Sequence, residues 1–304
     1  MTAIDVCYWN YAHGGRTHAN DVGEGGNYNF EPLCRVIGED DRWPHILILG
    51  EADRYDWDGG AGKWGAAAAM RAAGGRPYTP LMCHLPRDWG DFAPAIFVDL
   101  QAVEVWRFRQ PHQPGYAARR RNVLEARIPG RADVWRVVTG HGDLSGGLQR
   151  LLDAQELRPL ANPEFPCVIG MDWNSTPSGP QWEHRDLDQY DIAWRRANRI
   201  LWQHGQAQTG PFRPDTRALD YLCGYWNNGR RDGGIGFHWV AELAGDTTPT
   251  NLPTATGRQQ ATIDGFIVNE PWRDAIVPGS YLVQQLDPQH PESDHCPVRV
   301  TIDV

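Results

Sequence analysis

The part of the sequence that decides the fold reads Val168-Ile169-Gly170-Met171-Asp172-Trp173-Asn174-Ser175. An apolar run without polar alternation predicts a β-strand that is buried on both faces. The run ends in an acid and an amide two residues apart, so in extended backbone both side chains point to the same side. We therefore expect a buried strand that presents Asp172 and Asn174 at its end.

Five further segments place a polar residue at or beside an apolar run. They are Trp9-Asn10, Gly50-Glu51 after 46–49, His141 after 137–139, Asp264 within 262–267, and Ser293-Asp294-His295 before 298–302. Taken alone, each has an ordinary structural explanation, such as a turn residue or a solvated carboxylate. Strand ends are also where β-scaffolds carry catalytic groups on loops. Together the six segments predict one functional site.

The rest of the chain contains many short β-type runs and few helices. Predicted strands cover 4–9, 46–49, 95–100, 103–108, 122–128, 134–139, 167–170, 262–268, 281–286 and 298–302. Helical spacing of apolar residues predicts helices over 62–73, 147–157 and 190–204. The unbroken series of strands from 103 to 139 favours an antiparallel meander. This mixture predicts an α+β fold in which two sheets pack face to face, with helices outside.

The composition excludes several classes of protein. With 304 residues, 41% of them hydrophobic and 22% charged, the chain is long and apolar enough to form a sizeable core. A net charge of −9 argues against a protein that coats nucleic acid by charge alone, but not against a site that holds a few phosphates. No apolar run approaches the roughly 20 residues that cross a bilayer, and the first residues show no signal-peptide pattern.

These features predict a cytoplasmic protein with one domain over residues 1–304. The stretch at about 227–260 is rich in Gly, Thr, Pro and Arg, so we expect a long surface excursion there. The six cysteines contain no CxxC pair, and we expect them to be reduced thiols.

In order and spacing, the six polar segments resemble those of the endonuclease/exonuclease/phosphatase superfamily, a group of metal-dependent phosphoesterases. The resemblance extends from residue 10 to residue 295, with the motifs Asp-x-Asn and Ser-Asp-His intact. It implies a four-layer α/β/β/α sandwich of two mixed β-sheets. The sequence departs from the family at Gly50, where Gln is frequent, and at Thr262, where nuclease members often have Arg. It also departs at Met171, which separates Gly170 from Asp172 where the family has Gly-Asp.

The resemblance implies a metal site made by Asn10, Glu51 and Asp294. Their donors are hard oxygen atoms, which suit Mg²⁺ or Mn²⁺. No cysteine stands among them, so zinc is the poorer choice.

The resemblance also implies the catalytic residues His141, Asp172, Asn174, Asp264 and His295. Asp172 would orient or deprotonate the attacking water, and Asn174 would hold the phosphate. The two histidines would donate to the phosphoryl oxygens as charge develops. Asp264 would hydrogen-bond His295 and fix its tautomer.

The sequence thus favours a Mg²⁺-dependent nuclease that hydrolyses DNA or RNA by in-line attack of water. Arg119, Arg120 and Arg121 are candidate contacts to nucleic-acid phosphates, although three cations in a polar turn are more often a solvated corner. The alternative is a phosphatase or phosphodiesterase acting on a small-molecule, inositol or lipid phosphate. A third hypothesis, a non-catalytic binding module on the same fold, conflicts with the presence of both histidines and all the acids. The sequence indicates no protein partner.

Overall fold

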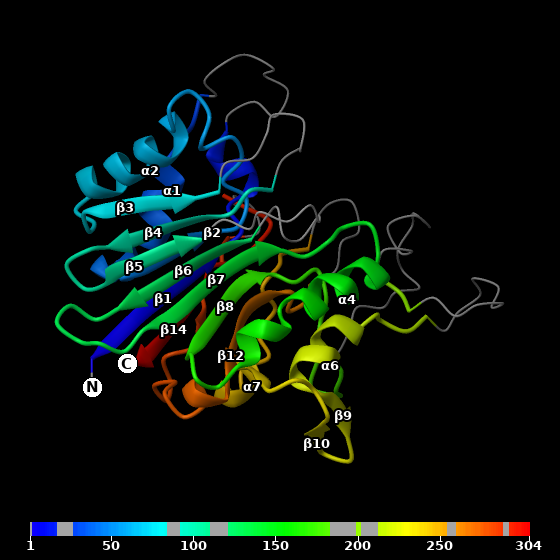
Figure 1. Ribbon diagram of the computed structural model, residues 1–304. Coiled ribbons are helices and arrows are strands. Elements are labelled where there is room, and N and C mark those ends of the chain that lie inside the picture. Colours follow the sequence, from blue (N-terminus) through cyan, green and yellow to red (C-terminus); the bar gives the residue numbers. More distant parts are fainter. Residues whose placement is uncertain are drawn as a thin grey trace.

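A computed structural model of the chain describes residues 2–16, 27–83, 92–109, 121–182, 199–201, 212–253, 260–287 and 292–304. Within these residues two six-stranded β-sheets pack face to face, with helices on the outside (Figure 1). The first sheet has the strand order β13-β14-β1-β2-β4-β3, and the second has the order β11-β12-β8-β7-β6-β5. This arrangement confirms the sandwich of two mixed sheets expected from the sequence.

The elements have the following bounds. The first sheet contains β1 (Ala3–Trp9), β2 (Ile46–Leu49), β3 (Tyr78–Met82), β4 (Ala95–Asp99), β13 (Leu282–Val283) and β14 (Val298–Asp303). The second contains β5 (Glu104–Arg109), β6 (Asn122–Arg127), β7 (Trp135–His141), β8 (Cys167–Asp172), β11 (Phe237–Trp239) and β12 (Asp264–Asn269). A separate hairpin consists of β9 (Tyr225–Asn227) and β10 (Arg230–Asp232). The α-helices are α1 (Glu31–Ile37), α2 (Ala61–Ala72), α4 (Gly147–Glu156), α6 (Arg217–Cys223) and α7 (Val240–Ala244), and short 3₁₀ turns cover Ala12–Gly15, Glu39–Asp41, Arg158–Ala161 and Glu270–Trp272.

The two sheets share one pairing pattern. Each has a single parallel pair, β1–β2 in the first sheet and β7–β8 in the second. Each parallel pair has an antiparallel strand beside it, β14 next to β1 and β12 next to β8. In both sheets, therefore, the carboxyl ends of two strands and the amino end of a third meet at the same edge. Those edges carry the six polar segments.

The central strands are almost wholly apolar because both of their faces are covered. Every residue of β2, β4, β8 and β12 is buried. One face of each sheet packs on the other sheet, while α1 and α2 cover the outside of the first and α4 and α6 the outside of the second (Figure 1). In the edge strand β5 no residue is buried, half of the residues are exposed, and half are charged.

Parts of the stretch at 227–260, for which the composition predicts a surface excursion, belong to the sandwich. Its strand β11 pairs with β12 at the edge of the second sheet, and Phe237, Trp239 and Val240 belong to the core. Thr250 and Asn251 are fully buried as well. Aromatic and β-branched residues scattered among glycines provide this burial. They have no regular apolar period, so the sequence did not indicate a buried strand there. Residues 254–259 lie outside the described part.

The predicted helix over 190–204 also lies mostly outside the described residues. Its described part, 199–201, has no helical turn, and Ile200 forms a β-bridge with Pro214. The helices α1 and α6 and the strand β3 were not predicted. All six cysteines are unpaired, in agreement with reduced thiols. Within the described ranges no helix has the length and apolar character needed to span a membrane.

Candidate active site

Three neighbouring strands of the second sheet place three polar side chains in a row. His141, the last residue of β7, is in register with Asp172, the last residue of β8. Asp172 is in turn in register with Asp264, the first residue of β12. All three are buried, and Asp172 Oδ2 lies 3.7 Å from His141 Nε2. The strand register alone therefore brings together an imidazole and two carboxylates that are far apart in the sequence.

A tight turn after β8 orients Asp172. The backbone N–H of Asn174 donates to Asp172 Oδ1 at 2.7 Å, and Asn174 Nδ2 donates to Oδ2 at 3.2 Å. Asn174 adopts φ 48°, a left-handed conformation that Asn tolerates better than most residues. The carbonyl of Gly142 accepts from Asn174 Nδ2 at 3.0 Å and from His141 Nδ1 at 2.9 Å. Because a carbonyl only accepts, His141 Nδ1 is protonated.

The first sheet contributes Asn10 and Glu51, which lie just beyond the ends of β1 and β2. Between β2 and Glu51 only glycine fits, because a Cβ atom on Gly50 would lie 2.2 Å from the hydroxyl oxygen of Tyr8. That hydroxyl accepts the backbone N–H of Asp172 at 2.7 Å. The Tyr8 side chain thus links the two sheets at the site, and the departure from the family's Gln has a steric reason.

Asn10 and Glu51 have the properties of cation ligands. Asn10 is buried and donates from Nδ2 to Asp172 Oδ2 at 3.3 Å, while its Oδ1 has no hydrogen-bond partner among the described residues. A buried amide oxygen without a donor is costly, and a hard cation would satisfy it. Burial raises the pKa of Glu51, but the imidazole of His141 and the charge of His295 outweigh this and lower the pKa to about 2. Glu51 is therefore ionised at neutral pH.

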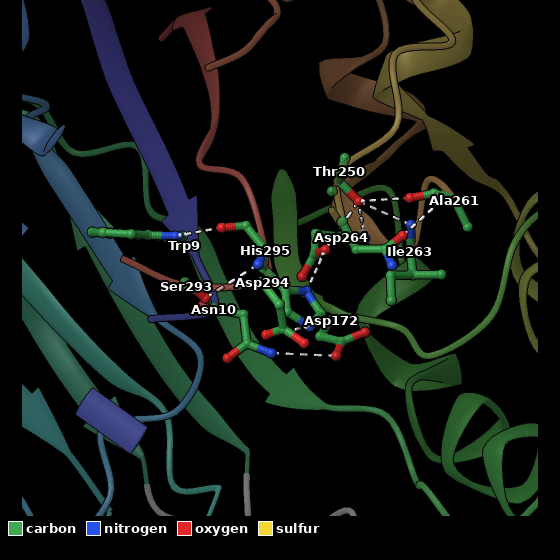
Figure 2. Close-up of polar contacts among 12 residues, drawn as sticks. Trp9, Asn10, Asp172, Thr250, Ala261, Ile263, Asp264, Ser293, Asp294 and His295 are labelled. Atoms are coloured by element: carbon green, nitrogen blue, oxygen red, sulfur yellow. Dashed lines mark hydrogen bonds and ion pairs between the residues drawn. The ribbon is translucent and has the colours of Figure 1, made fainter. Parts of the chain in front are cut away.

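The segment before β14 joins the two halves of the site. Ser293 Oγ donates to the Asn10 carbonyl at 2.6 Å and accepts the N–H of His295 at 3.2 Å. His295 Nδ1 lies 2.8 Å from Asp264 Oδ2, and its Nε2 lies 3.8 Å from Asp294 Oδ1. Figure 2 shows these side chains gathered between the ends of the two sheets.

Asp264 and His295 form a buried ion pair. Burial raises the pKa of Asp264, against the opposing charge of His295. Burial lowers the pKa of His295, but the charge and hydrogen bond of Asp264 reverse this and raise it well above its usual value. Thr250 supports the pair, because its hydroxyl donates to Asp264 Oδ2 at 2.9 Å and accepts the N–H groups of Ile263 and Asp264 (Figure 2).

The structure brings together all the predicted metal and catalytic residues, which are Asn10, Glu51, His141, Asp172, Asn174, Asp264, Asp294 and His295. Of the three candidate arginines, the structure describes Arg121, which makes none of these contacts. Arg121 immediately precedes β6 and donates from Nη1 to the carbonyl of Glu156 at the end of α4, at 3.3 Å. Arg119 and Arg120 lie outside the described residues.

Two residues on the Glu51 side of the site, His13 and Asp53, are not among the predicted site residues. The N–H of His13 donates to Glu51 Oε2 at 3.2 Å, and His13 Nδ1 lies 3.2 Å from Asp53 Oδ2. Asp53 Oδ1 accepts the N–H of Phe92, whose ring stacks on His141 with 4.9 Å between centroids. Among the described His, Cys, Asp and Glu side chains, two groups have ligand atoms within 4.8 Å of one another, namely His13–Glu51–Asp53 and Asp172–Asp264–His295. His13 and Asp53 lie in turns without an apolar period, so no spacing marks them.

Comparison with known proteins adds structural neighbours. No protein-family model and no curated protein matches the sequence. Danio rerio TDP2 in a humanized form has 12% identity and a TM-score of 0.58, with 99% of each chain covered. The same protein complexed with single strand DNA product has 13% identity and a TM-score of 0.56, with 100% of each chain covered.

Two further structures share the fold. An endonuclease/exonuclease/phosphatase family protein from Bacteroides thetaiotaomicron has 13% identity and a TM-score of 0.57, with 99% of this chain and 97% of that chain covered. ANGEL2, a 2',3'-cyclic phosphatase, has 14% identity and a TM-score of 0.56, with 98% and 94% covered. The chain has the endonuclease/exonuclease/phosphatase fold.

In this endonuclease/exonuclease/phosphatase fold, the polar cluster of the chain lies where the parallel pairs of both sheets end. The fold expected from the six segments is thereby confirmed. TM-scores of 0.56–0.58 over nearly the whole chain establish the fold, whereas identities of 12–15% transfer no residue's role, which the geometry of the cluster has to support.

Proposed function

We propose that the protein is a divalent-metal-dependent phosphodiesterase of nuclease type, which hydrolyses DNA or RNA by direct attack of water. The observation that carries the proposal is the orphaned Oδ1 of buried Asn10. The other atom of this amide, Nδ2, donates to Asp172, and Glu51, which is ionised, follows the neighbouring parallel strand β2. An unsatisfied amide oxygen and a carboxylate thus come from adjacent strand ends, as a metal-assisted hydrolytic site requires. The fold neighbours support it, since one of them is complexed with a single strand DNA product.

The metal would be held by Asn10, Glu51 and Asp294. Their oxygen donors favour Mg²⁺ or Mn²⁺. When bound there, the ion supplies positive charge to the non-bridging oxygens of the phosphate.

Asp172 is the residue that orients the attacking water and accepts its proton. Three N–H donors fix its carboxylate, from Asn10 Nδ2 and from the backbone and side chain of Asn174. The side-chain amide of Asn174 also donates to the Gly142 carbonyl. These contacts favour a role for Asn174 in positioning Asp172, in place of the phosphate contact implied by the family resemblance.

The two histidines donate to the phosphoryl oxygens as negative charge develops. His295 has Nδ1 toward Asp264, which directs Nε2 to the opposite side of the ring. His141 has Nδ1 bound to the Gly142 carbonyl, and its Nε2 lies 3.7 Å from both Glu51 Oε1 and Asp172 Oδ2. Each imidazole thus has a hydrogen bond at Nδ1 that fixes the ring, and its Nε2 is directed to the proposed phosphate position.

A substrate panel tests the proposal. The panel contains supercoiled plasmid, a single-stranded oligonucleotide, RNA, inositol phosphates and bis(p-nitrophenyl) phosphate, each with Mg²⁺, with Mn²⁺ or with EDTA. We expect metal-dependent cleavage of a polynucleotide and of the bis-ester, abolished by EDTA and restored by added metal. Full hydrolysis in excess EDTA, with no protein-bound metal by elemental analysis, would refute the metal dependence. Hydrolysis confined to the inositol phosphates would establish the alternative substrate class.

A further inference from the structure

A groove of about 400 Å³ opens beside the candidate active site. The side chains that give it hydrogen-bonding capacity are Thr176, Gln181, Trp182, Thr247, Gln260 and Thr262. Thr176 follows Asn174 by two residues, and Thr262 precedes Asp264 by two. Because two extended residues span at most about 7 Å, the groove begins next to the groups that surround the proposed phosphate position.

One wall of the groove is fixed by the chain that leads into β12. Thr262 Oγ1 donates to the carbonyl of Thr248 at 3.2 Å. The carbonyl of Ala261 accepts the N–H of Thr250 at 3.0 Å, and the N–H of Ala261 donates to Asn251 Oδ1 at 2.6 Å. Thr250 is the residue that also bonds to Asp264 (Figure 2), so this wall and the catalytic ion pair share one support.

The opposite wall is fixed by packing and by a second hydrogen-bonded turn. Trp182 is buried and packs edge-on against Trp239, with 6.3 Å between ring centroids. Ser178 Oγ donates to Asp220 Oδ1 at 2.7 Å and accepts the N–H of Trp226 at 2.8 Å. Both walls are therefore pre-formed, which lowers the ordering cost of binding a ligand between them.

The groove presents hydroxyl and amide groups, and among its described lining residues none carries a charge. Amides and hydroxyls of this kind recognise neutral groups such as base edges and sugar hydroxyls. Trp182 adds a second observation. Its Nε1 is buried without a hydrogen-bond partner among the described residues, whereas a buried indole N–H ordinarily has an acceptor.

We propose that this neutral groove binds the uncharged polar ring of the substrate that is esterified to the scissile phosphate. A nucleoside and a polyol ring such as inositol share the required chemistry. The inference rests on the proposed function, because it assumes that the phosphate lies at Asp172 and His295. It adds that selectivity arises from hydrogen bonds to the ring attached to that phosphate.

The test compares p-nitrophenyl phosphodiesters that differ only in the second ester group, which is thymidine, inositol or methyl. The test variant is the double substitution Gln181→Ala and Gln260→Ala. The matched control is Gln155→Ala, an exposed glutamine on α4. We expect the double variant to lower kcat/KM about fivefold to a hundredfold for the ring ester that the groove binds, because each lost hydrogen bond is worth roughly a factor of two to ten. The double variant should hydrolyse the methyl ester at the wild-type rate. The control variant should hydrolyse all three esters at the wild-type rates.

The thymidine and inositol arms identify which ring the groove accepts. Equal rates for the ring esters in wild type and double variant, or an equal loss on the methyl ester, would overturn the groove while leaving metal-dependent hydrolysis intact. Failure of the wild-type protein to hydrolyse any of the three esters with Mg²⁺ or Mn²⁺ would instead remove the proposed function, and the groove assignment with it. Circular dichroism spectra of the variants establish that they are folded.

Discussion

At the edge of the first sheet, Asn10 and Glu51 follow the parallel strands β1 and β2, while at the matching edge of the second sheet His141 and Asp172 end the parallel strands β7 and β8. The backbone pattern of the two edges is the same. The two edges differ in the hydrogen bonds that their side-chain oxygens receive. In the first sheet an amide oxygen has no donor among the described residues, whereas in the second sheet both oxygens of Asp172 receive N–H groups.

In the proposed function, one backbone arrangement supports two kinds of chemistry. The unsatisfied oxygen and the ionised Glu51 would bind the cation. The hydrogen-bonded Asp172 has a fixed orientation, which the proposed base would need in order to hold a water in line. Among the contacts that join the edges are the hydrogen bond between Tyr8 and Asp172 and the ion pair between His295 and Asp264. Substitutions at either edge, or at either of these two contacts, therefore measure separately what each sheet contributes to activity and stability.

The largest expected effect comes from the His295–Asp264 link. His295→Ala should lower kcat by about two to four orders of magnitude, the usual loss for a catalytic proton donor or oxyanion contact. Asp264→Asn should also lower it, and the double variant should be little worse than His295→Ala alone, because Asp264 acts through the histidine. Rates of the two single variants and the double variant decide this.

A surface pair provides the control for this cycle. His238, in the middle of β11, has its Nε2 2.6 Å from Oε2 of Glu270, and the Glu270 side chain is largely exposed. His238→Ala should leave kcat within about twofold of wild type, as expected for an exposed ion pair. Fully multiplicative losses in the His295 and Asp264 variants would show that the two residues act independently, and the proposed link would be wrong.

The next effect concerns the cation half of the comparison. Glu51→Gln removes a negative charge with almost no change in shape, so the fold should persist while Mg²⁺ or Mn²⁺ affinity falls by more than about tenfold. Isothermal titration calorimetry measures this directly. Glu156→Gln, on the exposed surface of α4, is the matched control. Unchanged metal binding by the Glu51 variant would remove that residue from the ligand set.

Most of the fold was predictable from the sequence, for a physical reason. Strands buried on both faces must be apolar throughout, so β2, β4 and β8 are visible as unbroken apolar runs. The edge strand β3 contains Pro80 and alternates between buried and half-exposed residues, and it was missed. Exposed alternation over five residues is too short to distinguish from a loop.

The candidate site was predictable only where its residues follow such strands. Asp172 and His141 end apolar runs, and the turn Asp-x-Asn has a recognisable spacing. Thr250 supports Asp264 from a position 14 residues earlier, across a stretch with no apolar period. Asp53 accepts the N–H of Phe92, the residue whose ring stacks on His141, and the two are 39 residues apart in the sequence. Contacts of this kind depend on how the loops return to the sheet edge. Local patterns in a single sequence do not reveal which loop residues meet there.

A smaller effect is expected from the direct link between the sheets at Tyr8. Tyr8→Phe keeps the ring but leaves the buried N–H of Asp172 without its acceptor. We expect the free energy of unfolding to fall by about 1–3 kcal/mol, the cost of an unsatisfied buried donor. Urea denaturation measures it, with Tyr225→Phe as the control, because Tyr225 is half exposed and should change stability by less than about 0.5 kcal/mol. Equal stability of the two variants would mean that the Tyr8 hydroxyl does not hold the edges together.

The smallest expected effect is a pH dependence of stability that depends on the His295–Asp264 pair. Asp264 raises the pKa of His295 in the folded protein well above its unfolded value of about 6.5. This stabilisation is therefore fully present below about pH 6.5 and is lost as the pH rises through the raised folded pKa. Between pH 7 and pH 8 the folded state retains a proton that the unfolded state has released, so the wild type should lose about 1 kcal/mol relative to Asp264→Asn. Asp264 also has a raised pKa, but its proton is lost in more acidic solution, so this window isolates the histidine.

Urea denaturation in EDTA, which removes any contribution from bound metal, gives both stabilities. If the two proteins had parallel stability curves from pH 7 to pH 8, His295 would hold no extra proton in the folded state, and the two sheets would not be joined by a charged pair.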